Sequence, residues 1–72
     1  MIREFDFDEL HKRLAVVMKK EARSQAEWGR LMGMDLTVFA NFINRRRHGL
    51  QYKNAVKLEN VIEQKEKELG IV

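Results

Sequence analysis

Hydrophobic residues recur every three or four positions along most of the chain, and this spacing places them on one side of an α-helix. The first series lies near the N-terminus and consists of Phe7, Leu10, Leu14, Val17 and Met18. Asp6 stands where an N-cap is needed, and Glu9 three residues later has the spacing of a capping box. The pattern predicts a first helix over about 7–22.

Two shorter series follow, one on each side of Gly33. Ser24 and Glu27 repeat the capping-box spacing, so we expect a second helix over about 24–32. Its inward residues are expected to be Trp28, Leu31 and Met32. Gly33 is typical of the left-handed residue that ends a helix and lets the chain turn.

Asp35 is placed to cap a third helix, which we expect to reach Asn44 or Arg45. Successive residues of a helix are 100° apart, so this segment has two different sides. The apolar side holds Phe39, Phe42 and Ile43, with Leu36 leaning toward it. The opposite side holds Thr37, Asn41 and Asn44, flanked by Ala40. That opposite side is therefore narrow and rich in short side chains that form hydrogen bonds.

A fourth helix is expected over about 51–69, because apolar residues again recur at helical spacing and Gly70 follows as a stop. Its inner face is formed by Ala55, Leu58 and Ile62, widened by Val56, Val61 and Leu69. The pattern leaves open whether this segment is one helix or two. The sequence contains no proline and no alternating strand pattern, so residues 1–72 are expected to form a single all-α domain of four to five helices.

Charge is distributed unevenly along the sequence, although the formal net charge is only +3. Residues 10–57 carry eleven Lys or Arg against three acids, whereas residues 1–9 and the segment from Glu59 onward are acidic. A basic middle with acidic ends indicates a surface that binds a polyanion. A short run of arginines is ordinarily a solvated face, so the charges alone do not identify that polyanion. The outer face of the first helix is expected to hold Lys12, Arg13, Lys19 and Lys20 as solubilising residues.

Several classes of function are not expected from this sequence. The longest apolar run, residues 14–18, is far below the ~20 residues that span a bilayer, and the N-terminus is acidic where a signal peptide is apolar. The chain has no cysteine, and His11 and His48 are expected to be ordinary surface histidines, because their spacing suits neither catalysis nor a metal. We therefore expect a cytoplasmic protein with no cofactor, no metal, no membrane contact, no small-molecule substrate and no enzymatic activity.

Two short helices joined by a glycine-containing turn, the second with a narrow polar side, describe a helix-turn-helix at about residues 24–45. Gly29 supplies the small residue that lets the two helices pack closely, and Gly33 supplies the turn. The narrow side of the helix at about 35–45 fits a DNA major groove, which is about 12 Å wide.

The segment from Gln25 to Asn44, QAEWGRLMGMDLTVFANFIN, resembles the helix-turn-helix of the lambda-repressor-like (Cro/C1) family. The opening Gln-Ala-Glu, the central Gly33 and the apolar positions Phe39 and Phe42 carry this resemblance, which extends to about residue 62. It implies a compact lambda-repressor-like domain and a sequence-specific regulator of transcription, such as a phage or bacterial repressor. It also implies a homodimer on a palindromic operator in double-stranded DNA.

The same resemblance implies roles for individual residues. The helix at about 35–45 would lie in the major groove, with base contacts from Thr37, Val38, Ala40 and Asn41. The DNA backbone would be held by Gln25, Asn44, Arg45, Arg46, Arg47 and Lys53. Contacts of this second kind position a protein on DNA but do not read its sequence. Asn41 is the sharpest candidate for a reader, because an asparagine pairs with adenine through two hydrogen bonds.

A second class of function remains open. Leu36 and Val38 stand where polar residues are common in that family, so the alternative is a protein-interaction module on the same scaffold, of antirepressor or antitoxin type. For the DNA-binding regulator, the dimer surface would come from the fourth helix or the tail, where the apolar residues are Val61, Leu69, Ile71 and Val72. A strong dependence of binding on salt would favour DNA, because contacts to phosphate release counterions.

Overall fold

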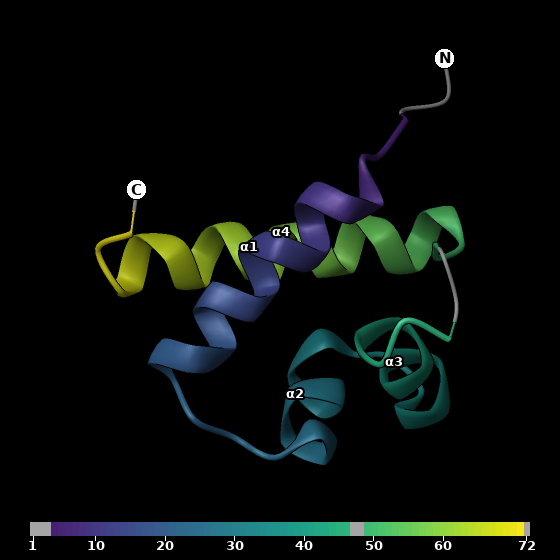
Figure 1. Ribbon diagram of the computed structural model, residues 1–72, viewed down its shortest axis with the longest axis horizontal. Coiled ribbons are helices and arrows are strands. Elements are labelled where there is room, and N and C mark those ends of the chain that lie inside the picture. The colour runs from purple at the N-terminus through teal and green to yellow at the C-terminus, as the bar shows by residue number, and fades with distance from the viewer. Residues whose placement is uncertain (1–3, 47–48, 72) are drawn as a thin grey trace.

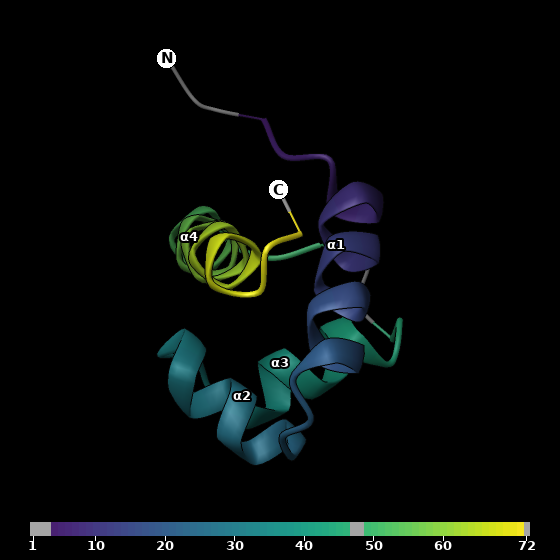
Figure 2. The same ribbon diagram turned by 90° about the vertical axis from the view of Figure 1, so that its left-hand side faces the viewer.

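Four α-helices form the part of the chain that the structure, a computed structural model, describes, namely residues 4–46 and 49–71. They are α1 (Phe7–Lys20), α2 (Gln25–Met32), α3 (Leu36–Ile43) and α4 (Tyr52–Glu68). In Figure 1, α1 crosses α4, and α2 and α3 lie together below that pair; Figure 2 shows α4 nearly end-on, with α1 running down past it toward α3. The prediction of an all-α domain is confirmed. Within the described ranges no helix is long and apolar enough to cross a membrane.

The predicted N-caps close the first three helices. Their hydrogen bonds run from Glu9 N to Asp6 Oδ1 (3.1 Å), from Glu27 N to Ser24 Oγ (3.1 Å) and from Thr37 N to Asp35 Oδ1 (2.8 Å). α1 ends at Lys20, short of the predicted end at residue 22, because Glu21 is extended (φ −121°). The carboxylate of Glu21 there pairs with Arg23 (2.7 Å) and with Lys65 of α4 (3.1 Å). α4 is one continuous helix, which settles the question that the pattern left open.

Each helix buries one side in a shared core. The core residues, each at most 8% exposed, are Leu10, Leu14, Val17, Trp28, Met32, Met34, Phe39, Phe42, Ala55, Leu58 and Ile62. Phe7, Met18 and Ile43 pack against its edge, as their positions in the pattern predicted. Burial of each large apolar side chain contributes about 1.5–3 kcal/mol, so this core is the main source of stability in so short a chain.

Two leucines do not face the way the pattern predicted. Leu31 is 41% exposed, so the expectation that it points inward is wrong. α2 buries Trp28, Gly29 and Met32, which centres its buried face near Met32 and turns Leu31 away by about 100°. Leu36 is 48% exposed and does not lean inward either. Both leucines border the turn between α2 and α3.

The turn between α2 and α3 is fixed by hydrogen bonds from two directions. Gly33 adopts the predicted left-handed conformation, with φ 70° and ψ 35°. The amide of Gly33 donates to the carbonyl of Arg30 and that of Met34 to the carbonyl of Gly29, both at 3.1 Å. Lys57 on α4 donates its Nζ to the carbonyl of Gly33 at 3.1 Å. The turn is thereby tied to a third helix, which holds α3 at a defined angle to α2.

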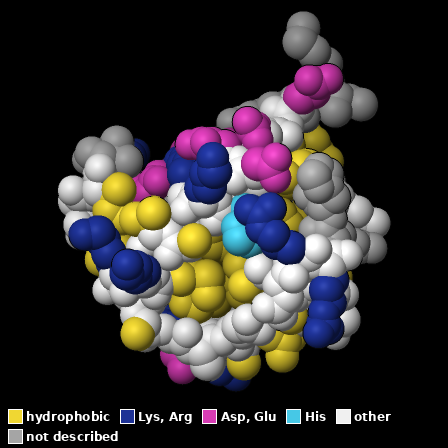
Figure 3. Space-filling model, in the orientation of Figure 1, with side chains coloured by type: hydrophobic (Ala, Val, Ile, Leu, Met, Phe, Trp, Pro, Cys, Tyr) yellow, Lys and Arg dark blue, Asp and Glu magenta, His cyan; other side chains and the backbone are white. Residues whose placement is uncertain are grey.

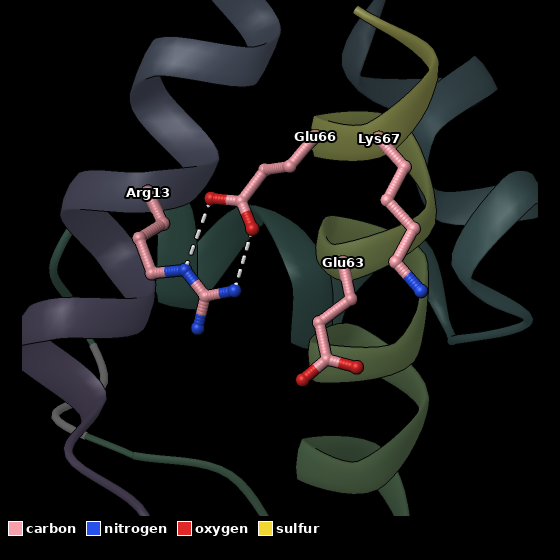
Figure 4. A pocket seen from close by; sticks show the side chains of 4 residues that line it. All are labelled: Arg13, Glu63, Glu66 and Lys67. Carbon is pink, nitrogen blue, oxygen red and sulfur yellow. Dashed lines mark hydrogen bonds and ion pairs between the residues drawn. The ribbon is translucent and has the colours of Figure 1, made fainter. Parts of the chain in front are cut away.

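α1 and α4 are joined by an ion pair that the sequence did not predict. Arg13 donates from Nε and Nη2 to the two carboxylate oxygens of Glu66, at 3.1 and 2.6 Å, and Glu66 is only 5% exposed. Hydrogen bonding to Glu66 raises the pKa of Arg13. Figure 4 shows this pair beside a pocket of about 250 Å³ that Glu63 and Lys67 also line. The expectation that Arg13 belongs to a merely solubilising outer face is therefore wrong.

Candidate nucleic-acid interface

α3 is a helix of eight residues whose back is locked into the core. Phe39 and Phe42, 0% and 2% exposed, anchor it there. Thr37, Asn41 and Asn44 follow one another at steps of four and three residues, which places them in one row on the opposite side. Thr37 and Asn44 are exposed and Asn41 is half-buried. The predicted polar row therefore lies at the surface, with Asn41 set deeper than its neighbours.

The two apolar candidates for base contacts lie on either side of this polar row. Val38 is half-buried and packs against the core, and Ala40 is half-buried as well. At 100° per residue, each lies roughly 60–100° from the line through Thr37 and Asn41. Among the four candidates, Thr37 and Asn41 are therefore the two that share the row, and the other two reach the surface only at its edges.

The candidates for phosphate contacts come from three segments of the chain. Gln25 is the exposed first residue of α2, and the backbone amides at a helix N-terminus attract anions. Asn44 is the C-cap of α3, and Arg45 and Arg46 follow it, all three exposed. Lys53 is exposed in the first turn of α4. Asn44 is the last residue of the polar row, and the other positions do not belong to that row.

Arg45, which directly follows the C-cap of α3, has an unusual backbone conformation. Its φ of 59° is left-handed, which costs about 1–2 kcal/mol for a residue with a side chain. Its amide donates to the carbonyl of Phe42 at 3.2 Å, and the amide of Arg46 donates to the carbonyl of Asn41 at 2.8 Å. The chain therefore reverses tightly and carries both arginines off the helix axis. Arg47, the remaining candidate for a phosphate contact, lies outside the described residues.

His11 is not the ordinary surface histidine that was expected. Its ring is half-buried, its Nε2 lies 3.0 Å from the carbonyl oxygen of Ile43, and it packs on Phe42 with 5.7 Å between ring centroids. Its Nδ1 lies 3.5 Å from Nη2 of Arg45. His11 thus joins α1 to the carboxyl end of α3. No local pattern predicts this contact, because it spans 32 residues of sequence.

Charge on the surface follows the uneven distribution in the sequence. Figure 3 shows hydrophobic side chains near the centre of one face, with Lys and Arg side chains around them. Acidic side chains gather toward the N-terminal end of the same face. Asp8, in the acidic first turn of α1, lies 3.8 Å from Arg45 of the basic middle segment.

No family model, no curated protein and no solved structure matches this chain. The functional argument therefore rests on the arrangement of α2, α3 and the residues around them.

Proposed function

We propose that the chain is a sequence-specific regulator of transcription that binds double-stranded DNA through a lambda-repressor-like helix-turn-helix, formed by α2, the Gly33 turn and α3. The polar row of Thr37, Asn41 and Asn44 is the observation that supports this most. A helix that reads bases needs a narrow outer side with hydrogen-bonding groups, and it needs a rigid support. α3 has both, because a cap, a tied turn and two buried phenylalanines hold it.

In this proposal α3 lies in the major groove. Asn41 pairs with an adenine through two hydrogen bonds, and Thr37 bonds to a neighbouring base edge. Val38 and Ala40, at the edges of the row, contact thymine methyl groups. The phosphates on either side of the groove are held by Gln25, Asn44, Arg45, Arg46, Arg47 and Lys53.

Two copies of the chain are proposed to bind one palindromic operator, because a recognition helix of eight residues reaches only a few base pairs. Val61, Leu69 and Ile71 are half-buried against the core, so each keeps part of its apolar surface for a second copy. Val72, the fourth residue expected at such a surface, lies outside the described residues.

A protein-interaction module of antirepressor or antitoxin type is the second candidate. It is favoured by Leu31 and Leu36, which are 41% and 48% exposed on the two helices that flank the turn. Covering such side chains with a partner gains about 25 cal/mol per Å² of apolar surface. In that case the two leucines, and not the polar row, form the interface.

Selection from a random pool of DNA duplexes distinguishes these candidates. The DNA-binding proposal predicts that a palindrome is enriched and that Leu31→Gln selects the same sequence. If no sequence is enriched even at low salt, the interaction module becomes the better account of the surface.

Single substitutions then test the roles of the residues. Asn41→Ala should relax base preference at one position of each half-site, at a cost of about 1–3 kcal/mol on the preferred base. Arg46→Ala should weaken binding to all sequences alike, because phosphate contacts carry no sequence information. Asn60→Ala, at an exposed position of α4, is the matched control and should change neither quantity. An unchanged site preference in Asn41→Ala would show that Asn41 does not read a base.

A further inference from the structure

The guanidinium of Arg45 lies against two side chains of α1 that are three residues apart. Its Nη1 is 3.8 Å from Oδ1 of Asp8, and its Nη2 is 3.5 Å from Nδ1 of His11. Figure 3 shows histidine, basic and acidic atoms side by side on this face of the molecule. The guanidinium of Arg45 is therefore held by contacts within the chain when no ligand is bound.

The two contacts of the His11 ring are both hydrogen bonds only in one tautomer of the imidazole. The carbonyl oxygen of Ile43 only accepts hydrogen bonds, so Nε2 at 3.0 Å must carry the proton. Nδ1 is then the acceptor in the neutral ring, and it faces an N–H of Arg45. Packing on Phe42 keeps the ring in this orientation. Both contacts are satisfied only while the imidazole is neutral.

Protonation of His11 reverses this arrangement. With a second proton, Nδ1 becomes a hydrogen-bond donor and can no longer accept from the guanidinium of Arg45. The imidazolium and the guanidinium then also repel each other as like charges. Among the described residues, the charged groups joined to this side of the ring are Asp8 on α1 and Arg45 just after α3, and Arg45 is the one with an atom 3.5 Å from a ring nitrogen. The α4 carboxylates Glu59, Glu63 and Glu66 act on Arg13, which at 100° per residue lies on the opposite side of α1 from His11. Histidine is the side chain whose charge ordinarily changes between pH 5 and 8.

We propose that Asp8 and neutral His11 form a latch that holds Arg45 away from polyanions, and that either a DNA phosphate or a proton on His11 releases it. Asp8 offers the same kind of anionic oxygen as a phosphate does. Arg45 and Asp8 are 60% and 64% exposed, so their attraction is weak enough to be exchanged for a phosphate. Release by phosphate rests on the proposed function, whereas release by a proton does not.

The proton-dependent step is tested by NMR in the absence of DNA. A His48→Gln background leaves His11 as the only histidine, and ring-nitrogen shifts should show the Nε2–H tautomer at pH 7.5. Lowering the pH to 5 should shift the side-chain signals of Arg45. In addition, His11→Gln should remove that shift, because an amide both donates to Ile43 and accepts from Arg45 at every pH. An Nδ1–H tautomer, or Arg45 signals that stay unchanged between pH 7.5 and pH 5, would overturn this step.

The phosphate-dependent step is tested by fluorescence anisotropy with a random-sequence 20-base-pair duplex at low salt. Asp8→Asn should tighten binding by about two- to fivefold, as expected for loss of one exposed ion pair. Glu9→Gln is the matched control, because it removes the same charge from the same turn of α1 and should give a smaller gain. In an Arg45→Gln background, Asp8→Asn should gain no more than Glu9→Gln, which isolates the pair.

The possible failures of this experiment have different meanings. Equal gains from Asp8→Asn and Glu9→Gln in the wild-type background overturn the latch while leaving DNA binding intact. Failure of the wild-type chain to bind any duplex overturns release by phosphate together with the proposed function. The NMR titration still decides release by a proton in that case.

Discussion

Of the two glycines near the turn, one needs to lack a side chain and the other does not. At Gly33 the backbone φ is +70°, a conformation that residues with side chains rarely adopt. Gly29 lies inside α2, and a Cβ there would meet Leu36 Cδ1 at 3.6 Å, which is ordinary van der Waals contact. The predicted role of Gly29 as a close-packing residue is therefore not required by the packing, whereas the predicted role of Gly33 is.

Gly29→Ala should therefore stabilise the fold by about 0.5–1 kcal/mol, because alanine loses less backbone entropy in a helix. Gly33→Ala should destabilise it by about 1–2 kcal/mol, because it forces a side chain into the left-handed region. Urea denaturation of the two variants and the wild type measures both changes. A destabilised Gly29→Ala would mean that α2 and α3 approach more closely than the structure shows.

Individual contacts across the chain were the least predictable part of the site. Thr37, Asn41 and Asn44 were identified as one row because helical spacing alone defines a row. Helical spacing does not state how deep a row lies, so the half-burial of Asn41 was missed. His11 was missed for another reason, since its partner Ile43 comes from a distant segment and the sequence provides no register between the two helices.

At the scale of helices, α1 and α4 are held together by ion pairs as well as by the core. Arg13 and Glu66 pair in the middle of α1, and Glu21 and Lys65 pair at its end. Glu66 is nearly fully buried, so its charge depends on Arg13 for compensation.

Glu66→Ala should destabilise the fold by about 1–3 kcal/mol, because it removes the partner of a charge and opens space between the helices. The value stays below that for a fully buried pair, since Arg13 is 29% exposed and can be hydrated. Glu63→Ala, which alters the same pocket from an exposed position, should change stability by less than about 0.5 kcal/mol. Chemical denaturation compares the two, and equal effects would show that the ion pair does not stabilise the contact between α1 and α4.

The second pair makes stability depend on pH. Hydrogen bonds from Arg23 and Lys65 lower the pKa of Glu21. A carboxylate whose pKa is lower in the folded state stabilises the fold above its unfolded pKa of about 4.3, and this contribution is lost as the pH falls further. Glu21→Gln should thus be less stable than the wild type at pH 7, and this difference should shrink as the pH falls below about 4.

Denaturation curves at a series of pH values measure that convergence. Glu63→Gln, which removes an exposed carboxylate from α4, is the control and should keep a constant difference from the wild type. A constant difference for Glu21→Gln as well would show that the pairing with Arg23 and Lys65 does not form in solution.

The helices themselves were predictable because their signals are local. Each segment contains its own apolar spacing, three of the helices begin with a capping residue, and two are followed by a glycine stop. The structure confirms the three caps and the left-handed conformation of Gly33 and Gly70. The end of α1 was not predictable, because Glu21 leaves the helix to meet Lys65 from α4. Leu31 was misassigned because a helix of eight residues contains too few apolar positions to fix the centre of its buried face.

At the scale of the whole molecule, the proposed function makes a prediction about salt. Four cationic candidates for phosphate contacts, Arg45, Arg46, Arg47 and Lys53, imply a slope of log affinity against log salt of about −3.5 per protomer. A dimer on a palindrome should double that slope, and Arg46→Ala should reduce it by about 1 per protomer. Titration of a labelled duplex at several salt concentrations measures the slope. A slope near zero would favour the protein-interaction module.

The position of Trp28 gives the molecule a built-in optical reporter. It is the only tryptophan of the chain, it is fully buried, and its indole N–H has no acceptor among the described residues. Its emission should therefore lie at the short wavelengths of an indole in apolar surroundings and move to longer wavelengths when the core opens. The polar row of α3 faces away from the core, so the proposed binding to DNA should leave this emission largely unchanged. Each variant can therefore be monitored for folding in the same cuvette in which its binding is measured.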